Sequence, residues 1–123
     1  FRQFAYQSLQ VSSSKTANFN RADGMTVMGN ILHSDGTIKV WFVHNDEMAL
    51  VAVEAVAASG KDIKIVGFDA TDDAQKAVKD GKMAATVAQK PDKMGETAIG
   101  TAVKIMAGET VEKSIPVEVE LIK

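Results

Sequence analysis

Helical patterns alternate with short apolar strand patterns along this chain, and that alternation constrains the fold more than any other feature. Strands are expected at residues 9–13, 39–43, 63–68, 83–89 and 115–123. Helices are expected at residues 1–7, 22–33, 46–59, 70–80 and 91–107. Strands that alternate with helices are typical of a parallel sheet, because a parallel connection needs a crossover long enough to hold a helix. The predicted class is therefore α/β.

The segment KVWFV at 39–43 reads as a continuous apolar run. Such a run is typical of a strand covered on both faces, so we expect both Trp41 and Phe42 in the core. The following helix, at 46–59, is rich in alanine and valine and should end at Gly60. The helix at 22–33 should bury one face, made by Met25, Met28 and Leu32.

Composition and charge exclude several classes of function. The chain has 123 residues, of which 46% are hydrophobic, a balance typical of one globular domain with a core. Its net charge of −2, with lysines scattered among acids, leaves no basic stripe, so nucleic acid is not an expected partner. No apolar run approaches the ~20 residues of a membrane span. Zero cysteines and two histidines leave little for a transition-metal site, so no metal or other cofactor is expected.

Polar and aromatic residues stand at the carboxyl ends of the expected strands, which is where open parallel sheets bind ligands. The set offers a carboxylate, a guanidinium, two amides and two aromatic rings, from Phe19, Arg21, Asn45, Phe68, Asp69 and Gln89. A carboxylate can accept protons from two sugar hydroxyls, while arginine and amide groups donate to the sugar oxygens. Aromatic rings can cover the C–H faces of the same ligand. The set therefore favours a polyhydroxylated ligand such as a sugar.

Residues at these strand ends also have structural interpretations. Asp46 and Thr71 are expected to cap helices, Asp69 can serve in a turn, and core packing explains Phe19 and Phe68 taken alone. Enzyme interpretations are weaker, because no serine, histidine and acid are placed for nucleophilic activation and glycine-rich phosphate loops are absent. A phospho-acceptor receiver domain is set aside as well, since its first strand would lead into an acidic cluster and here SSSKTANF follows.

Several motifs in one order carry a family resemblance. They are FNR at 19–21, HNDEMAL at 44–50, VGFDAT at 66–71, DGKMAATVAQKPDKMG at 80–95 and KSIPVEVELI at 113–122. Together they resemble the periplasmic sugar-binding proteins of bacterial ABC transporters, the ribose-binding proteins among them. The resemblance implies a type I periplasmic-binding fold, in which a flavodoxin-like lobe forms a three-layer sandwich around a parallel sheet, here incomplete.

The resemblance also implies roles for individual residues. Phe19 and Arg21 fall where the family places an aromatic and an arginine against the pentose, and Asn45 takes the place of its sugar-binding asparagine. Phe68 and Asp69 match an aromatic and a carboxylate that contact the sugar, and Gln89 matches the glutamine just before the hinge. Departures from the family pattern, such as FDAT for FDGT, border these residues and leave the sugar itself open.

The implied function is binding without catalysis. The protein would capture a monosaccharide, with D-ribose as first candidate, and deliver it to the membrane permease of an ABC transporter, with a chemoreceptor as a further partner. Such a protein would be periplasmic or extracytoplasmic, and lipid-anchored in a Gram-positive cell. The alternative is the effector-binding domain of a sugar-responsive LacI-type transcription repressor, which shares the fold.

The family's chain path divides the sequence into two parts. Residues 1–89 would form most of the carboxyl-terminal sugar-binding lobe. Residues 90–123 would form a hinge-crossing helix and a final strand that pack with the amino-terminal lobe and the hinge. The chain begins FRQFAYQ without an initiator methionine, so an upstream part is expected. The missing lobe, or a companion fragment, is therefore an expected partner.

Overall fold

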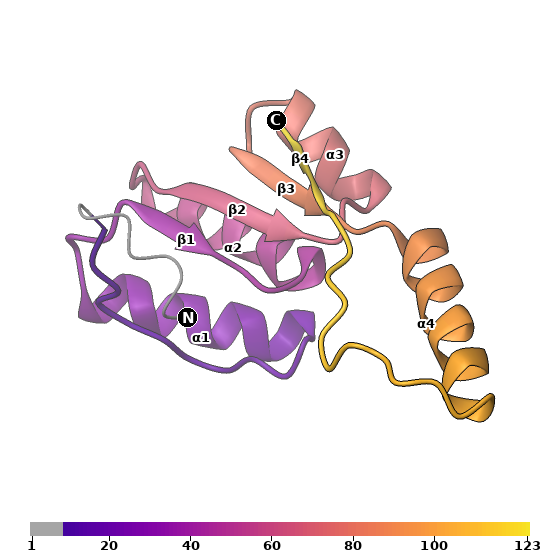
Figure 1. Ribbon diagram of the computed structural model, residues 1–123. Coiled ribbons are helices and arrows are strands. Elements are labelled where there is room, and N and C mark those ends of the chain that lie inside the picture. The colour runs from indigo at the N-terminus through magenta and orange to yellow at the C-terminus, as the bar shows by residue number, and fades with distance from the viewer. Residues whose placement is uncertain (1–8) are drawn as a thin grey trace.

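The computed structural model describes residues 9–123 (Figure 1). Its centre is a four-stranded sheet. The strands lie side by side in chain order and are β1 (Val40–Phe42), β2 (Lys64–Phe68), β3 (Ala85–Ala88) and β4 (Glu120–Ile122). The first three are parallel, whereas β4 runs antiparallel to β3. The predicted α/β class is confirmed, and the sheet is open and mixed, with helices packed against it.

The helices agree closely with the sequence pattern. They are α1 (Arg21–Ser34), α2 (Asp46–Ser59), α3 (Asp72–Lys79) and α4 (Pro91–Met106). Local signals define α2 at both ends, because the Asn45 side chain accepts a hydrogen bond from the Met48 amide and Gly60 adopts the left-handed conformation. The predicted range of α2 is therefore confirmed at both ends. The helix expected at 1–7 lies outside the described residues.

Two of the predicted strands differ from the structure. Residues 9–13 form no strand, and Leu9 and Val11 are 64% and 62% exposed, because the segment finds no neighbouring strand with which to pair. The final strand is shorter than the expected 115–123, since its ladder extends only along the short strand β3 and Pro116 has no amide hydrogen to donate.

The core lies between β1, β2 and the apolar face of α2. Trp41 and Ile65 are paired across β1 and β2 and are both buried. Phe42, which points to the opposite face because side chains alternate along a strand, is 37% exposed. The expectation that β1 is covered on both faces, with Phe42 in the core, is therefore wrong.

Helix α1 packs against α2 through a different face from the one expected. Met28 is buried as predicted, whereas Met25 is 39% exposed and Leu32 is only partly buried. Gly24 and Ile31 complete the buried side. A side chain at Gly24 would lie 3.0 Å from Val51 of α2, so this glycine lets the two helices approach closely.

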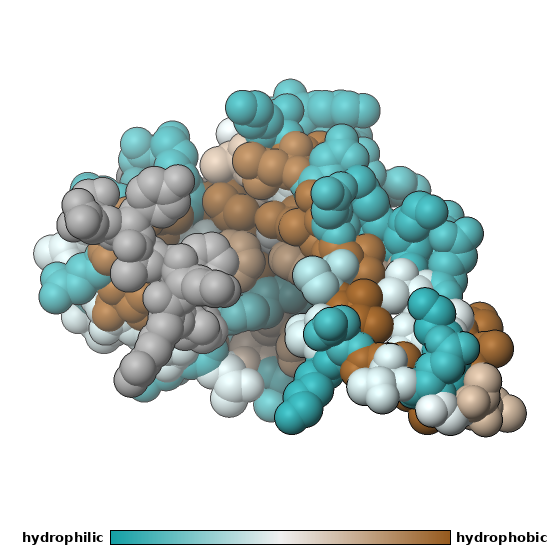
Figure 2. All heavy atoms as spheres, viewed as in Figure 1, coloured by the Kyte–Doolittle hydropathy of each residue, from teal (hydrophilic) through white to brown (hydrophobic). Residues whose placement is uncertain are grey.

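Helix α4 projects from the end of the sheet, and the chain returns from it along a long connection to β4 (Figure 1). No residue of α4 is buried. Figure 2 shows hydrophobic residues across the middle of the viewed face and again over the lower part of α4. The most exposed large apolar side chains of this helix are Ile99, Val103, Ile105 and Met106. Within residues 9–123, no helix is both long and apolar enough to cross a membrane.

Gly67 in β2 provides a test of the packing between α2 and the sheet. A Cβ atom here would overlap Asp46 Oδ1 and would lie 2.8 Å from Met83 Cε and 3.2 Å from Ala49 Cβ. We expect Gly67→Ala to lower the free energy of unfolding by about 2 kcal/mol or more, as overpacking does. The matched control is Gly29→Ala on α1, where nothing lies within 4 Å of the added atom and where we expect a gain of about 1 kcal/mol. Urea unfolding measures both, and equal effects of the two substitutions would contradict this account.

Candidate functional site

Two of the sequence-predicted site residues meet at the carboxyl ends of β2 and β3. Asp69 follows β2 and Gln89 follows β3, so the parallel pairing of these strands brings the two side chains to one edge of the sheet. Gln89 Nε2 donates a hydrogen bond of 2.6 Å to Asp69 Oδ1. The Asp69 amide also donates to the Val87 carbonyl at 2.9 Å. Asp69 is exposed, so its carboxylate faces solvent at this edge.

Asn45 connects a second pair of predicted residues at the start of α2. Its Oδ1 accepts a hydrogen bond of 3.0 Å from the Met48 amide, while its Nδ2 donates to the Phe19 carbonyl at 3.3 Å. The amide group therefore holds the loop before α1 against the beginning of α2. Phe19 is 67% exposed, so the core-packing interpretation of this residue is wrong. Phe68 is partly buried at the end of β2.

Arg21 pairs with Glu47, a residue that sequence reasoning did not single out. Arg21 Nε donates to Glu47 Oε2 at 2.5 Å, and Nη2 donates to Oε1 at 3.3 Å. This contact raises the pKa of the Arg21 guanidinium and lowers the pKa of the Glu47 carboxyl. Both side chains are about half exposed, so solvent screens the pair. The available signal was the position of Glu47 in the first turn of a helix that begins at a strand end.

Asp46 lies beneath this edge and is fully buried. Its Oδ2 accepts hydrogen bonds from the Thr71 amide at 2.8 Å and from Thr71 Oγ1 at 3.2 Å. Its Oδ1 accepts from Thr86 Oγ1 at 2.8 Å. The expectation that Asp46 caps a helix is wrong, because Asn45 is the cap and Asp46 is drawn inward to Thr86. Thr71 caps α3 as predicted, through a contact with the Ala74 amide.

The loops that carry the candidate residues have unusual backbone conformations. Asn18 and Phe19, before α1, have φ values of 50° and 56°. Asp69 and Ala70, after β2, have φ values of 117° and 55°. Residues with side chains rarely adopt positive φ, and such strained positions concentrate at ligand sites. Sequence reasoning did not anticipate this strain.

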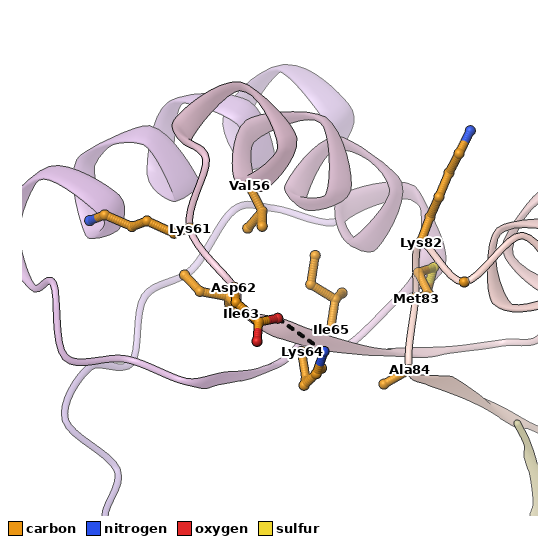
Figure 3. Close-up of a pocket in the computed structure, with 10 residues that line it drawn as sticks. Val56, Lys61, Asp62, Ile63, Lys64, Ile65, Lys82, Met83 and Ala84 are labelled. Atoms are coloured by element: carbon orange, nitrogen blue, oxygen red, sulfur yellow. Dashed lines mark hydrogen bonds and ion pairs between the residues drawn. The ribbon is translucent and has the colours of Figure 1, made fainter.

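A separate hollow of about 440 Å³ lies at the opposite edge of the sheet (Figure 3). It is lined by residues at the amino ends of β2 and β3, including Ile63, Ile65, Met83 and three lysines. One of these lysines, Lys64, donates to Asp62 Oδ1 at 2.9 Å, and Figure 3 shows Lys82 extending away from the hollow. The hollow contains none of the predicted site residues. In the part of the chain that the structure describes, no group of three or more His, Cys, Asp or Glu residues could hold a metal.

The arrangement at the carboxyl edge suits hydrogen bonding to a neutral polar ligand. Asp69 offers carboxylate oxygens beside the amide of Gln89, and Arg21 offers guanidinium donors from the start of α1. Exposed Phe19 and half-buried Phe68 supply apolar surface. The described residues form this edge without enclosing it.

The chain matches known proteins along most of its length. Residues 1–110 match the family model for the periplasmic binding protein domain. The chain is 51% identical over 112 residues to the ribose import binding protein of Haemophilus influenzae, a match that covers 91% of this chain and 38% of that protein. It is 46% identical over 121 residues to the ribose import binding protein of Bacillus subtilis, covering 98% of this chain and 40% of the relative.

A solved structure supports the same relationship. An ABC transporter periplasmic solute binding protein from Actinobacillus succinogenes, with bound D-allose, superimposes with a TM-score of 0.76 at 30% identity. The match covers 95% of this chain and 42% of that structure. The present chain thus spans about two fifths of the length of the relatives that it matches.

Ala70 tests the strain in the candidate loop. An L-residue at a φ of 55° costs about 1 kcal/mol that glycine avoids, although glycine loses more entropy on folding. We expect Ala70→Gly to raise the free energy of unfolding by about 0.5 kcal/mol. The control is Ala57→Gly at an exposed position of α2, which should lower it by about 1 kcal/mol. Urea unfolding measures both variants, and a loss of stability in Ala70→Gly as large as that of the control would rule out strain at Ala70.

Proposed function

This chain belongs to the family of periplasmic binding protein domains, and on that basis we propose that it is part of a solute-binding subunit that captures a monosaccharide for an ABC transporter. The observation that carries the proposal is the pairing of Asp69 with Gln89 at the carboxyl ends of β2 and β3. The ribose import function named for the relatives supports a sugar as the ligand. The proposed role is reversible binding, with no catalysis.

Asp69 is the proposed main acceptor for the sugar. Within residues 9–123, the Gln89 contact is the only hydrogen bond of its side chain, so Oδ2 can accept from a sugar hydroxyl. Arg21 uses two of its N–H groups on Glu47 and has others to offer a sugar oxygen. Phe19 and Phe68 would cover C–H faces of the ring, Asn45 would contribute an amide, and Gln89 would contact both Asp69 and the sugar.

D-Ribose is the first candidate and D-allose is the second. The two relatives compared above are named for ribose import, whereas the solved neighbour holds D-allose. In their pyranose forms the two sugars share the configuration of the ring hydroxyls, and allose adds a hydroxymethyl group. In the proposed site the polar residues would bind hydroxyls that both sugars share, so discrimination between ribose and allose would depend on the space around the hydroxymethyl group.

We further propose that residues 1–89 form most of a carboxyl-terminal lobe, while residues 90–123 pack with an amino-terminal lobe and hinge. The exposed apolar side chains of α4 support this, because monomeric proteins seldom leave such a face open to water. A sugar that contacts both lobes would favour their closed arrangement by its higher affinity for that state. A membrane permease and a chemoreceptor are the proposed partners of that closed state, and the proposed location is extracytoplasmic, with a lipid anchor in a Gram-positive cell.

Substitution of Asp69 tests the sugar site in the complete gene product. We expect the intact protein to bind ribose or allose, and Asp69→Ala to weaken that binding at least about 100-fold, because sugar hydroxyls and Gln89 lose a charged acceptor. Gln89→Ala should cause a smaller loss. The affinities are measured by calorimetric titration with ribose, allose, xylose, arabinose, galactose and glucose.

Asp62→Ala, at the opposite edge of the sheet, is the control and should bind sugar as the wild type does. Unchanged affinity in Asp69→Ala would remove this residue from the site.

Substitution of Ile99 tests the proposed packing of α4. This side chain is 70% exposed in the described chain, so Ile99→Ala should change the stability by less than about 0.5 kcal/mol if the face stays open. If a second lobe covers it in the complete protein, we expect a loss of about 2 kcal/mol or more. Lys104→Ala, an exposed position of the same helix, is the control. A neutral result for Ile99→Ala in the complete protein would contradict the proposed division.

A further inference from the structure

A buried carboxylate lies directly beneath the proposed sugar site. Asp46 and Thr86 are both fully buried, and among the described residues Asp46 has no ion-pair partner. An unpaired buried charge is costly unless hydrogen bonds and local dipoles compensate for it. Asp46 receives hydrogen bonds from Thr71 and Thr86 and stands at the first position of α2, where the helix dipole favours an anion.

Thr86 connects Asp46 to a second backbone amide, that of Ala70, through hydrogen bonds. The Thr86 hydroxyl donates its single hydrogen to Asp46 Oδ1, because a carboxylate can only accept. The same oxygen accepts a hydrogen bond of 3.2 Å from the Ala70 amide. Asp46 therefore holds the Thr71 amide directly at 2.8 Å and the Ala70 amide through Thr86.

The two amides held in this way belong to the residues that immediately follow Asp69. Asp69 and Ala70 both have positive φ values, a conformation that persists only when surrounding contacts enforce it. On the other side, the Asp69 amide donates to the Val87 carbonyl. Gly67 lets Asp46 occupy its position, since any side chain there would overlap Asp46 Oδ1.

We propose that Asp46 is a positioning residue for ligand binding: its buried carboxylate, acting on Thr71 directly and on Ala70 through Thr86, holds the strained turn that presents Asp69. This inference rests on the proposed function, because Asp69 is the residue that would contact the sugar. Asp46 itself, being fully buried, touches no ligand.

Substitutions of similar size can distinguish a loss of affinity caused by poor positioning of Asp69 from one caused by lower overall stability. Asp46→Asn replaces one acceptor oxygen by an NH₂ donor, so either the Thr71 amide or the Thr86 hydroxyl loses its acceptor. Thr86→Val removes the hydroxyl at nearly constant volume, whereas Thr86→Ser keeps it and should restore the function. Ile65→Val, a buried change in β2 that leaves the network intact, is the control for lost stability. All variants are made in the complete gene product.

We expect Asp46→Asn and Thr86→Val to weaken ribose binding by about tenfold or more, while Thr86→Ser and Ile65→Val stay within about twofold of the wild type. Without sugar, hydrogen exchange at the Ala70 and Thr71 amides should accelerate in the first two variants alone. If Asp46→Asn does not fold, the comparison of Thr86→Val with Thr86→Ser still tests the inference.

Two results would overturn the inference. Wild-type affinity in Asp46→Asn and Thr86→Val would show that the turn needs no such support. An equal loss in Ile65→Val would show that affinity follows stability rather than positioning. If the wild-type protein binds none of the sugars, the proposed function itself fails and this inference fails with it, so the two failures are told apart by the wild-type titration.

Discussion

The contact between the start of α2 and the sheet at Gly67 determines much of this structure. There a carboxylate, rather than an apolar side chain, lies between helix and strand, and it is held by two threonines from different elements. The hydrogen bonds join the beginning of α2, the cap of α3 and the middle of β3. A single buried carboxylate thus connects three segments that are far apart in the sequence. Through these contacts the same network also holds the turn after β2.

The ion pair of Arg21 and Glu47 fixes the orientation of another candidate side chain. A free arginine side chain would lose considerable rotational freedom on meeting a ligand. Here Glu47, from the first turn of α2, already orients the guanidinium, so in the proposed binding role part of that entropy would be lost on folding and not on binding. Asn45 acts similarly on the loop before α1, because its amide holds the Phe19 carbonyl. Both contacts leave the exposed surface organised in advance of any ligand.

Local signals made the helices predictable, and sheet topology made the meeting of Asp69 and Gln89 predictable, whereas other contacts between distant residues were not. Asn45 and Gly60 mark the ends of α2 by their own chemistry, and the strand-end rule brought Asp69 and Gln89 together. Phe42 was misassigned because an apolar run does not tell which of its faces another layer covers. Asp46 was misassigned because its environment is made by Thr71 and Thr86, which no sequence spacing connects to it.

The order of the strands has a consequence for how this chain folds. Each strand pairs with the next one along the sequence, so β1, β2 and β3 can assemble by successive closures of moderate length as the chain lengthens. Strand β4 also pairs with its predecessor, but α4 and a long connection separate it from β3, so it can run back antiparallel along β3 only after both have been synthesised. During synthesis the carboxyl ends of β2 and β3, with Asp69, can therefore form before β4 joins the sheet, and the edge of β3 remains open to pairing in the interval.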